Sequence, residues 1–449
     1  MKKSKLGMWS TLFLILPISF NGATISLLPY QFHLVGIVLA TILFLLSSVV
    51  CIYAGFLIVS LSPQVQMDTA NTVKALTYHE LAQRTLGECK CCKQKSNQSR
   101  SIALEKVRKM CGKFVSSLMA VMNCICLMGA GVAGVVFNKN VAAESVKVSY
   151  EGGGKEPPEL LTQSWVWALV FIWGTLFPPL TCPRVSCIKY ISYITSGLCV
   201  LYIFIVVWGV FHFPRPSPSD VDYFKPDVES VQIAFTLFLY PLLYQPNIQT
   251  IFHELERPTI RRTTVALTLD TAIVFVTYLI IGLLGYIPFA ATPALKEIII
   301  EDQNIFKAGD FAVWTPNRVY GILFLSTTLT LILSCLFPVK MVLLEFFGKA
   351  GSRSCGWNAL ASIALCIVLL GFSLAINETS LAIRIIGVTF YPIMCFVFPA
   401  LFYILAPRKE RLSRCQKVHF SISIVMCVSI SMFAIFGFYQ VLIVLSQAQ

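Results

Sequence analysis

Charge is scarce in this sequence. Only 13% of the 449 residues are charged and 56% are hydrophobic, whereas an ordinary soluble domain carries about 25% charged residues. This shortage excludes a soluble globular protein, because no soluble core accounts for so much apolar sequence. The sequence also lacks a His-Glu-x-x-His pattern, a phosphate-binding glycine loop and an acid pair on one helix face. We therefore predict that the protein is not an enzyme.

Cysteine is missing from particular segments. The chain has 16 cysteines, but none lies in the predicted outer loops 139–163, 211–229 and 289–317. Disulfides need an oxidising compartment, so we expect none. The cluster Cys89-Lys90-Cys91-Cys92 lacks a second ligand pair at the spacing of a zinc site. We expect reduced or lipid-modified thiols there, and we predict no bound cofactor.

Long apolar runs fill most of the chain. A helix that spans a bilayer needs about 20 mostly apolar residues, and about eleven such runs are present. We predict an all-α polytopic membrane protein in which residues 1–449 form one transmembrane domain. The runs lie near 8–30, 34–61, 113–138, 164–181, 189–210, 230–252, 264–288, 318–347, 358–377, 380–405 and 419–446.

Basic residues are distributed unevenly between the loops. If the N-terminus is cytoplasmic, the inner segments hold 25 of the 35 Lys and Arg residues, and the outer loops hold 8. Cytoplasmic loops carry such an excess, so we predict that 62–112 is a cytoplasmic loop and that the C-terminus is outside or luminal. The net charge of +13 then reports orientation rather than a nucleic-acid partner. Contact of the basic inner loops with membrane lipid is the less favoured addition to this interpretation. Within this loop, 72–86 is predicted to form an amphipathic surface helix.

Two of the runs contain helix-breaking residues. In the first, Asn21-Gly22 is a poor helix sequence and Pro29 lacks a backbone donor. In the sixth, Pro241 and Pro246 are only five positions apart. The first and the sixth run occupy equivalent positions in the two halves if spans one to five and spans six to ten form two inverted repeats. Interrupted spans at matching positions indicate a transporter binding site, although single prolines also kink membrane helices without any function.

A broken helix leaves backbone amides and carbonyls without partners at membrane depth. A zwitterionic amino acid supplies a partner for the amides and a partner for the carbonyls. Its carboxylate suits the positive end of one half-helix, and its ammonium suits the carbonyls that end another. We therefore interpret the two breaks as an amino-acid site.

Three segments resemble motifs of the amino acid/auxin permeases. Residues 22–30 are similar to that family's Gly-x-Gly-Ile-Leu-x-Leu-Pro-Tyr, and 245–255 resemble its His-Pro-Asn-x-x-x-Ile-x-x-Glu-Leu. Residues 336–340 resemble its Phe-Pro-x-Arg/Lys turn. The resemblance implies a LeuT-type fold of two inverted five-span repeats plus one extra helix, with a central site between spans one, three, six and eight.

The sequence departs from the family pattern at three positions. Thr24 replaces the second glycine of the first motif, and Gln245, which cannot titrate, replaces a frequent histidine. Ile18 stands where sodium-coupled members carry an asparagine that helps to hold sodium. The predicted substrate-binding residues are Asn21, Gly22, Ala23, Thr24, Tyr240, Tyr244 and Gln245.

Coupling to an ion rests on two sets of residues. Asp270 is an acid inside the seventh span, where acids are costly and usually functional. It is a candidate proton carrier, or it is simply stabilised by the positive end of its helix and by Arg261 and Arg262. Ser326, Thr327 and Thr328 offer hydroxyls that suit sodium, although such hydroxyls usually bond the preceding turn. Both H⁺ and Na⁺ therefore stay open as coupling ions.

The sequence favours a secondary active transporter of amino acids that works by alternating access. The alternative is an amino-acid sensor that signals through its cytoplasmic loops with little flux. Either would reside in the plasma membrane or a vacuolar or lysosomal membrane. Lys340 and Arg384, near span ends, are expected to snorkel to the interface.

Overall fold

The computed structural model describes the chain in separate stretches. They are 22–67, 78–86, 100–152, 154–182, 221–242, 244–248, 259–290, 331–348, 354–376, 390–406 and 414–447, with isolated positions at 194–204 and 387. Every regular element in these stretches is helical. The α-helices are α2 (Gly22–Val35), α3 (Ile37–Met67), α4 (Tyr78–Leu86), α5 (Arg100–Gly152), α6 (Glu159–Thr162), α7 (Ser164–Leu169), α8 (Phe177–Leu180), α10 (Val228–Leu239), α12 (Ile260–Ala290), α15 (Phe337–Phe346), α16 (Cys355–Ala375), α18 (Phe398–Leu405) and α19 (Arg414–Gln447).

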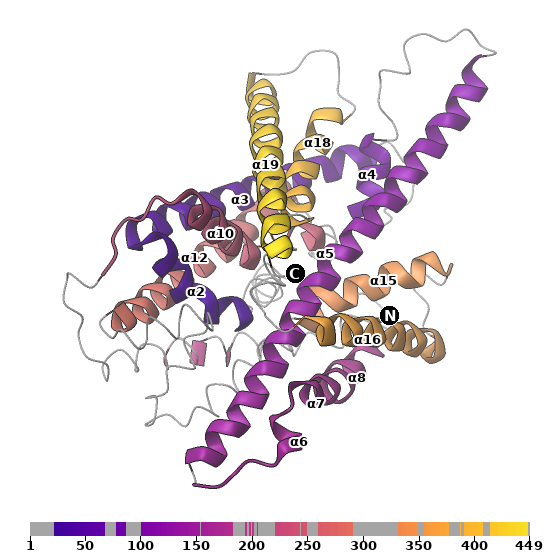
Figure 1. Cartoon of the computed structure of the whole chain (residues 1–449). Coiled ribbons are helices and arrows are strands. Elements are labelled where there is room, and N and C mark those ends of the chain that lie inside the picture. Colours follow the sequence, from indigo (N-terminus) through magenta and orange to yellow (C-terminus); the bar gives the residue numbers. More distant parts are fainter. Residues whose placement is uncertain are drawn as a thin grey trace.

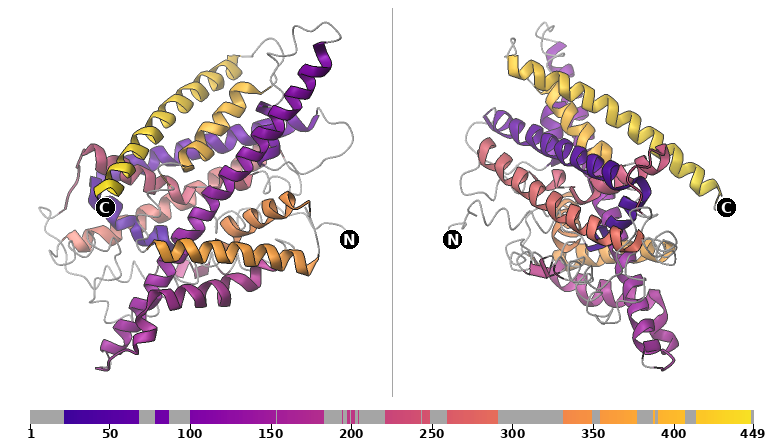
Figure 2. Two further views of the ribbon diagram at one scale, coloured as in Figure 1. Left: turned by 45° about the vertical axis from the view of Figure 1, so that its right-hand side comes forward. Right: turned by 90° about the vertical axis from the view of Figure 1, so that its left-hand side faces the viewer.

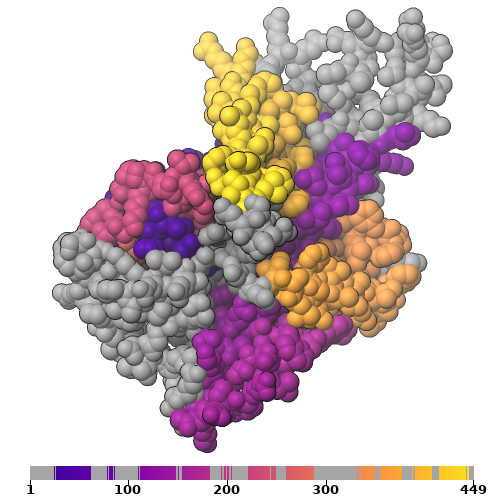
Figure 3. Space-filling model, viewed as in Figure 1, coloured from indigo at the N-terminus to yellow at the C-terminus, as the bar shows by residue number. Residues whose placement is uncertain are grey.

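The membrane-spanning prediction is confirmed over these residues. Five helices there are long and apolar enough to cross a bilayer, and they coincide with the predicted spans two, three, seven, nine and eleven. Shorter apolar helices at Ser164–Leu180 and Phe390–Leu405 match spans four and ten. The apolar window of α19 is only 22% buried, and α19 lies along the outside of the molecule (Figure 3). Its apolar surface is therefore available to lipid.

The helix α5 corrects one predicted boundary. The sequence placed an outer loop from 139, but α5 continues to Gly152. Residues 139–151 contain neither Gly nor Pro, so nothing in them stops a helix. With 53 residues at about 1.5 Å each, α5 is much longer than the hydrocarbon core. It crosses the whole molecule diagonally (Figure 1).

Three π-helical turns share one sequence feature. They span Val170–Leu176, Ile332–Leu336 and Ile393–Val397, and each is followed directly by a Phe-Pro pair. The Phe amides donate to the carbonyls five residues back, from Phe177 to Ile172, Phe337 to Ile332 and Phe398 to Ile393. Proline clashes with the preceding turn and lacks an N–H, so the helix widens by one residue in front of it.

The helices form two groups on either side of α5 (Figures 1 and 2). In one group, α2 and α3 contact each other, and each of them contacts α10 and α12. Its core is aromatic, with Phe44 centred 5.1 Å from both Phe238 and Phe275. In the other group, α7, α8, α15 and α16 pack together beside α5. The predicted breaks belong to the first group.

The turn between α2 and α3 is held by the segment before α10. Gly36 has a φ of 81°, and a Cβ atom there would lie 2.7 Å from the Phe224 nitrogen. The Ile37 and Val38 amides donate to the Asp222 and Tyr223 carbonyls at 3.1 and 3.0 Å. Glycine is thus required by both the backbone angle and the close approach.

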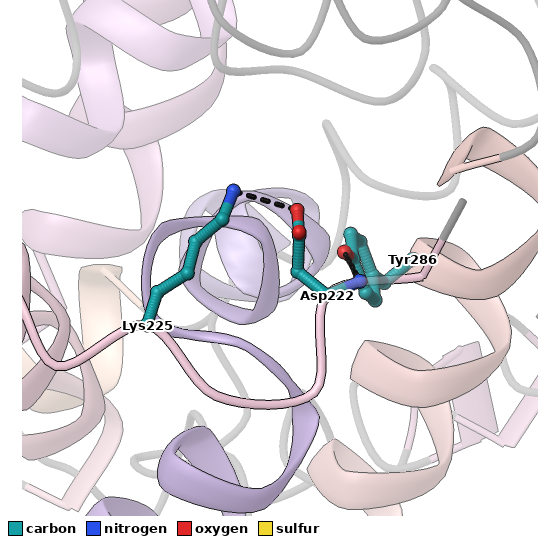
Figure 4. A network of polar contacts seen from close by, with 3 residues as sticks. All are labelled: Asp222, Lys225 and Tyr286. Atoms are coloured by element: carbon teal, nitrogen blue, oxygen red, sulfur yellow. Dashed lines mark hydrogen bonds and ion pairs between the residues drawn. The ribbon is translucent and has the colours of Figure 1, made fainter. Parts of the chain in front are cut away.

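The same segment also reaches α12 (Figure 4). The Asp222 amide donates to the Tyr286 hydroxyl at 3.1 Å. The Asp222 carboxylate pairs with the Lys225 ammonium at 2.6 Å. The ends of α2, α3, α10 and α12 are therefore tied together on one side of the molecule.

The helix α4 lies within the predicted range 72–86 and is amphipathic. Its buried residues are Tyr78, Leu81, Ala82 and Thr85, which share one face. This face packs on α5 and α18, and the Tyr78 hydroxyl donates to the Met394 carbonyl at 2.6 Å. The cytoplasmic location of 62–112 stays a prediction, but part of this segment belongs to the helical bundle.

The expectation for Lys340 is wrong, and Arg384 lies outside the described residues. Lys340 is 0% exposed, and its ammonium donates to the carbonyls of Leu180 and Cys182. Snorkelling was expected because a lysine near a span end usually reaches the interface. Here a helix end from a distant part of the sequence supplies the polar partners instead.

Candidate functional site

Span six is interrupted at the predicted place. The helix α10 ends at Leu239, and short 3₁₀ turns follow at Tyr240–Leu242 and Gln245–Asn247. Pro241 and Pro246 lie in these turns and cannot donate to an α-helical ladder. The prediction that no straight helix runs through 240–247 is confirmed.

The two tyrosines of the break point at different neighbours. Tyr240 packs edge-on against Tyr391, with ring centroids 5.5 Å apart. The Tyr244 hydroxyl lies 3.1 Å from the Thr271 hydroxyl on α12. Gly55 on α3 makes room for Tyr244, because a Cβ there would lie 3.3 Å from its ring. Both tyrosines are buried, and their contact with substrate stays a prediction.

Gln245 is completely buried at the centre of the break. Its side-chain amide lies beside the Cys51 thiol of α3. Neither its oxygen nor its nitrogen has a hydrogen-bond partner of ordinary geometry among the described residues. A buried amide in this state is costly unless a ligand or water satisfies it.

Asp270 lies close to the break, on α12. Asp270 is 0% exposed. It lies near enough to Tyr244 for the two groups to interact electrostatically, and Cys51 and Cys395 also lie that near to Tyr244. Because α12 begins at Ile260, Asp270 lies almost three turns into the helix. The helix dipole acts mainly within the first turn, so the dipole explanation for this acid loses force.

The span-one residues are described only in part. Over the described residues α2 is helical from Gly22 through Pro29 to Val35, and the predicted break at Asn21-Gly22 lies at the edge of the described part and stays a prediction. Pro29 therefore does not interrupt the helix. The surroundings of Gly22, the side chains of Ala23 and Thr24, and the whole of Asn21 lie outside the described part. The proposed ion ligands Ser326, Thr327 and Thr328 also lie outside it.

Sequence reasoning missed several buried polar side chains. Gln31 on α2 and Asn138 on α5 are 0% exposed, and their amides have no hydrogen-bond partner within the described stretches. The sequence signal that could have found them is a side-chain amide inside an apolar run. Gln31 also follows directly after the first motif, residues 22–30. Across the same stretches, no three His, Cys, Asp or Glu residues form a metal-binding group.

Two comparisons with known proteins agree with this geometry. Residues 4–444 match the family described as transmembrane amino acid transporter protein. Among solved structures, the chain is similar to Mhp1, a nucleobase-cation-symport-1 family transporter in a closed conformation with bromovinylhydantoin bound, with a TM-score of 0.58 and 11% identity. The match covers 99% of this chain and 94% of that chain. At this identity the likeness shows the fold alone, and that fold is LeuT-like.

Proposed function

Because this chain belongs to the transmembrane amino acid transporter family, we propose that it carries amino acids across a membrane as a secondary active transporter that works by alternating access. Membership and fold establish a multi-pass membrane transporter. The amino-acid substrate and the alternating-access cycle are our proposal. The observation that carries it is the break in span six between Leu239 and Ile248, at the end of the helix α10, which packs against α2.

The two half-helices provide complementary charges. The sequence predicts a helix break at Asn21-Gly22, directly before the described part of α2, and the first amides of a half-helix that begins there would have no intrahelical acceptor. The helix α10 ends at Leu239, where the last carbonyls carry partial negative charge. The two helices lie side by side. We assign the substrate carboxylate to the predicted break at Asn21-Gly22 and its ammonium to the end of α10.

Asp270 is our candidate for the coupling group. It is buried near Tyr244 in the break, so a proton on its carboxyl can influence the segment that holds the substrate. The competing proposal is Na⁺ bound by Ser326, Thr327 and Thr328. The two proposals differ in whether accumulation follows the pH gradient or the sodium gradient.

We also propose that the N-terminus and the 62–112 loop face the cytosol. The excess of Lys and Arg in the inner segments supports this orientation. In intact cells, an impermeant thiol reagent added outside should leave Cys89, Cys91 and Cys92 unmodified. Their modification from outside would reverse the orientation.

Uptake into proteoliposomes tests the proposed function. Purified protein is reconstituted, and a panel of labelled amino acids is offered under an inward proton gradient, an inward sodium gradient or no gradient. The proposal expects saturable accumulation of at least one amino acid above its external concentration under one of the gradients. Binding without accumulation would favour the sensor instead.

A further inference from the structure

We propose that Lys139 and Lys340 are paired positioning residues that fasten spans three, four, eight and nine into one unit, each at one end of the bundle. Both are almost completely buried, at 1% and 0% exposed. They lie on α5 and α15, which belong to spans three and eight. The inference rests on the contacts of these helices and does not require the proposed transport.

Lys340 caps the end of span four. Its ammonium donates to the Leu180 carbonyl at 2.8 Å and to the Cys182 carbonyl at 2.6 Å, just where α8 ends. It also lies 4.3 Å from the centroid of the Phe337 ring. The C-terminal end of a helix carries partial negative charge and favours a cation. A buried ammonium with these partners is thus stabilised without reaching water.

Lys139 caps the end of span nine in the same way. Its ammonium donates to the Ser373 carbonyl at 2.5 Å and to the Ile376 carbonyl at 3.1 Å. Ile376 directly follows Ala375, the last residue of α16. Two lysines far apart in the sequence therefore make the same contact with the C-terminal carbonyls of two different spans.

The two contacts are related by the predicted inverted repeat. Spans three and eight hold the same place in the two halves, and so do spans four and nine. The symmetry operation that exchanges the two halves places span three on span eight and span nine on span four. It therefore places the Lys139 contact, which joins spans three and nine, on the Lys340 contact, which joins spans eight and four. An inverted repeat also exchanges the membrane faces, so the two caps belong to opposite faces.

Further contacts join the same helices. The Ser362 hydroxyl of α16 also donates to the Leu180 carbonyl, at 3.0 Å, so spans four, eight and nine meet at one point. Gly131 on α5 brings Leu369 and Leu336 within 3.1 and 3.3 Å of a Cβ position. These spans are thus packed closely in the middle and capped at both ends.

The caps are tested on purified protein in lipid nanodiscs, where both faces are accessible. The reporter for the Lys340 cap is the free thiol of Cys182, and Cys355, which is exposed, is the internal control. Their rates of modification by a charged maleimide are followed by mass spectrometry. Lys340→Met should raise the Cys182 rate about tenfold or more and leave the Cys355 rate unchanged. Lys340→Arg, which keeps charged donors, should retain protection.

The other cap serves as the matched control. Lys139→Met should leave Cys182 protected but expose a thiol introduced by Ile376→Cys, whereas Lys340→Met should not affect that thiol. Equal changes at both reporters in either variant would mean general loosening and would overturn the proposal, as would continued protection of Cys182 in Lys340→Met.

If the variants fail to fold, a measurement on the unmodified protein still tests the two caps. An acylating reagent should modify Lys139 and Lys340 at least about tenfold more slowly than Lys225, which is 42% exposed. Rapid acylation of either buried lysine in the folded protein would also contradict the two caps.

Discussion

The Tyr244 hydroxyl lies 3.1 Å from the Thr271 hydroxyl, so the break in span six is joined directly to span seven next to Asp270. Thr271 also donates to the Leu267 carbonyl at 2.9 Å, which leaves Tyr244 as the donor across the two spans. The contact connects the segment assigned to the substrate with the acid assigned to coupling.

A double-mutant cycle measures this contact. Tyr244→Phe and Thr271→Val each remove one partner, and the two changes together should cost about 1 kcal/mol less in unfolding free energy than the sum of the single costs. The measurement is thermal unfolding of purified protein. Thr268→Val is the control, since its hydroxyl bonds only the Thr264 carbonyl of its own helix. Additive costs for Tyr244 and Thr271 would show that the hydroxyls do not interact.

Gly36 should tolerate no side chain. In Gly36→Ala the new methyl group meets the backbone at Tyr223 and Phe224, so we expect a loss of at least about 2 kcal/mol in unfolding free energy. Gly154→Ala is the matched control, because its φ is also positive, at 63°, but nothing lies within 4 Å. That change should cost only the backbone strain, about 1 kcal/mol. Equal losses in thermal unfolding would mean that 222–225 does not hold the turn.

Asp227 should make the start of α10 sensitive to acid. Its carboxylate accepts from the Ser230 amide at 2.9 Å, and this hydrogen bond lowers its pKa. A lowered pKa in the folded state stabilises the protein above the ordinary value of about 3.9, and this contribution disappears as pH falls through the folded value. Asp227→Asn keeps an acceptor for the cap but cannot titrate. The thermal midpoint of the variant should fall less than that of the wild type between pH 6 and pH 3; identical profiles would exclude this role.

Asp270→Asn should separate exchange from accumulation. If the Asp270 carboxyl carries the coupling proton, the variant should still exchange internal for external amino acid but should not accumulate it under an inward proton gradient. Uptake is measured in proteoliposomes, with Glu144→Gln on α5 as the control acid. Normal pH dependence in Asp270→Asn would make this residue structural and would favour sodium at Ser326, Thr327 and Thr328.

Much of the helical architecture could be predicted because membrane spans have a strong local signal. Apolar length located spans two, three, seven, nine and eleven, and Pro241 with Pro246 located the break in span six. Proline alone was a poorer guide at Pro29, which lies inside α2. A membrane helix keeps such a proline when neighbouring groups satisfy the freed carbonyl, and the local sequence does not reveal those neighbours.

The lysine contacts could not be predicted for a similar reason. Lys340 bonds carbonyls 160 and 158 residues away, so its partners depend on tertiary packing. The π-helical turns did have a local signal, the Phe-Pro pairs at 177–178, 337–338 and 398–399. Only the pair at 337–338 lies within a segment that resembles a family motif.

Amino-acid counterflow tests the central claim most directly. Proteoliposomes loaded with a high concentration of unlabelled amino acid are diluted into a trace of the labelled one without any ion gradient. An alternating-access carrier should concentrate the label transiently inside, and Gly22→Leu should abolish this overshoot, because a large side chain at the predicted break in span one blocks close approach of the substrate. Gly371→Leu, at a glycine with nothing within 4 Å, should retain it. Absence of overshoot for every amino acid tested, or a normal overshoot in a well-folded Gly22→Leu protein, would contradict the proposed site and mechanism.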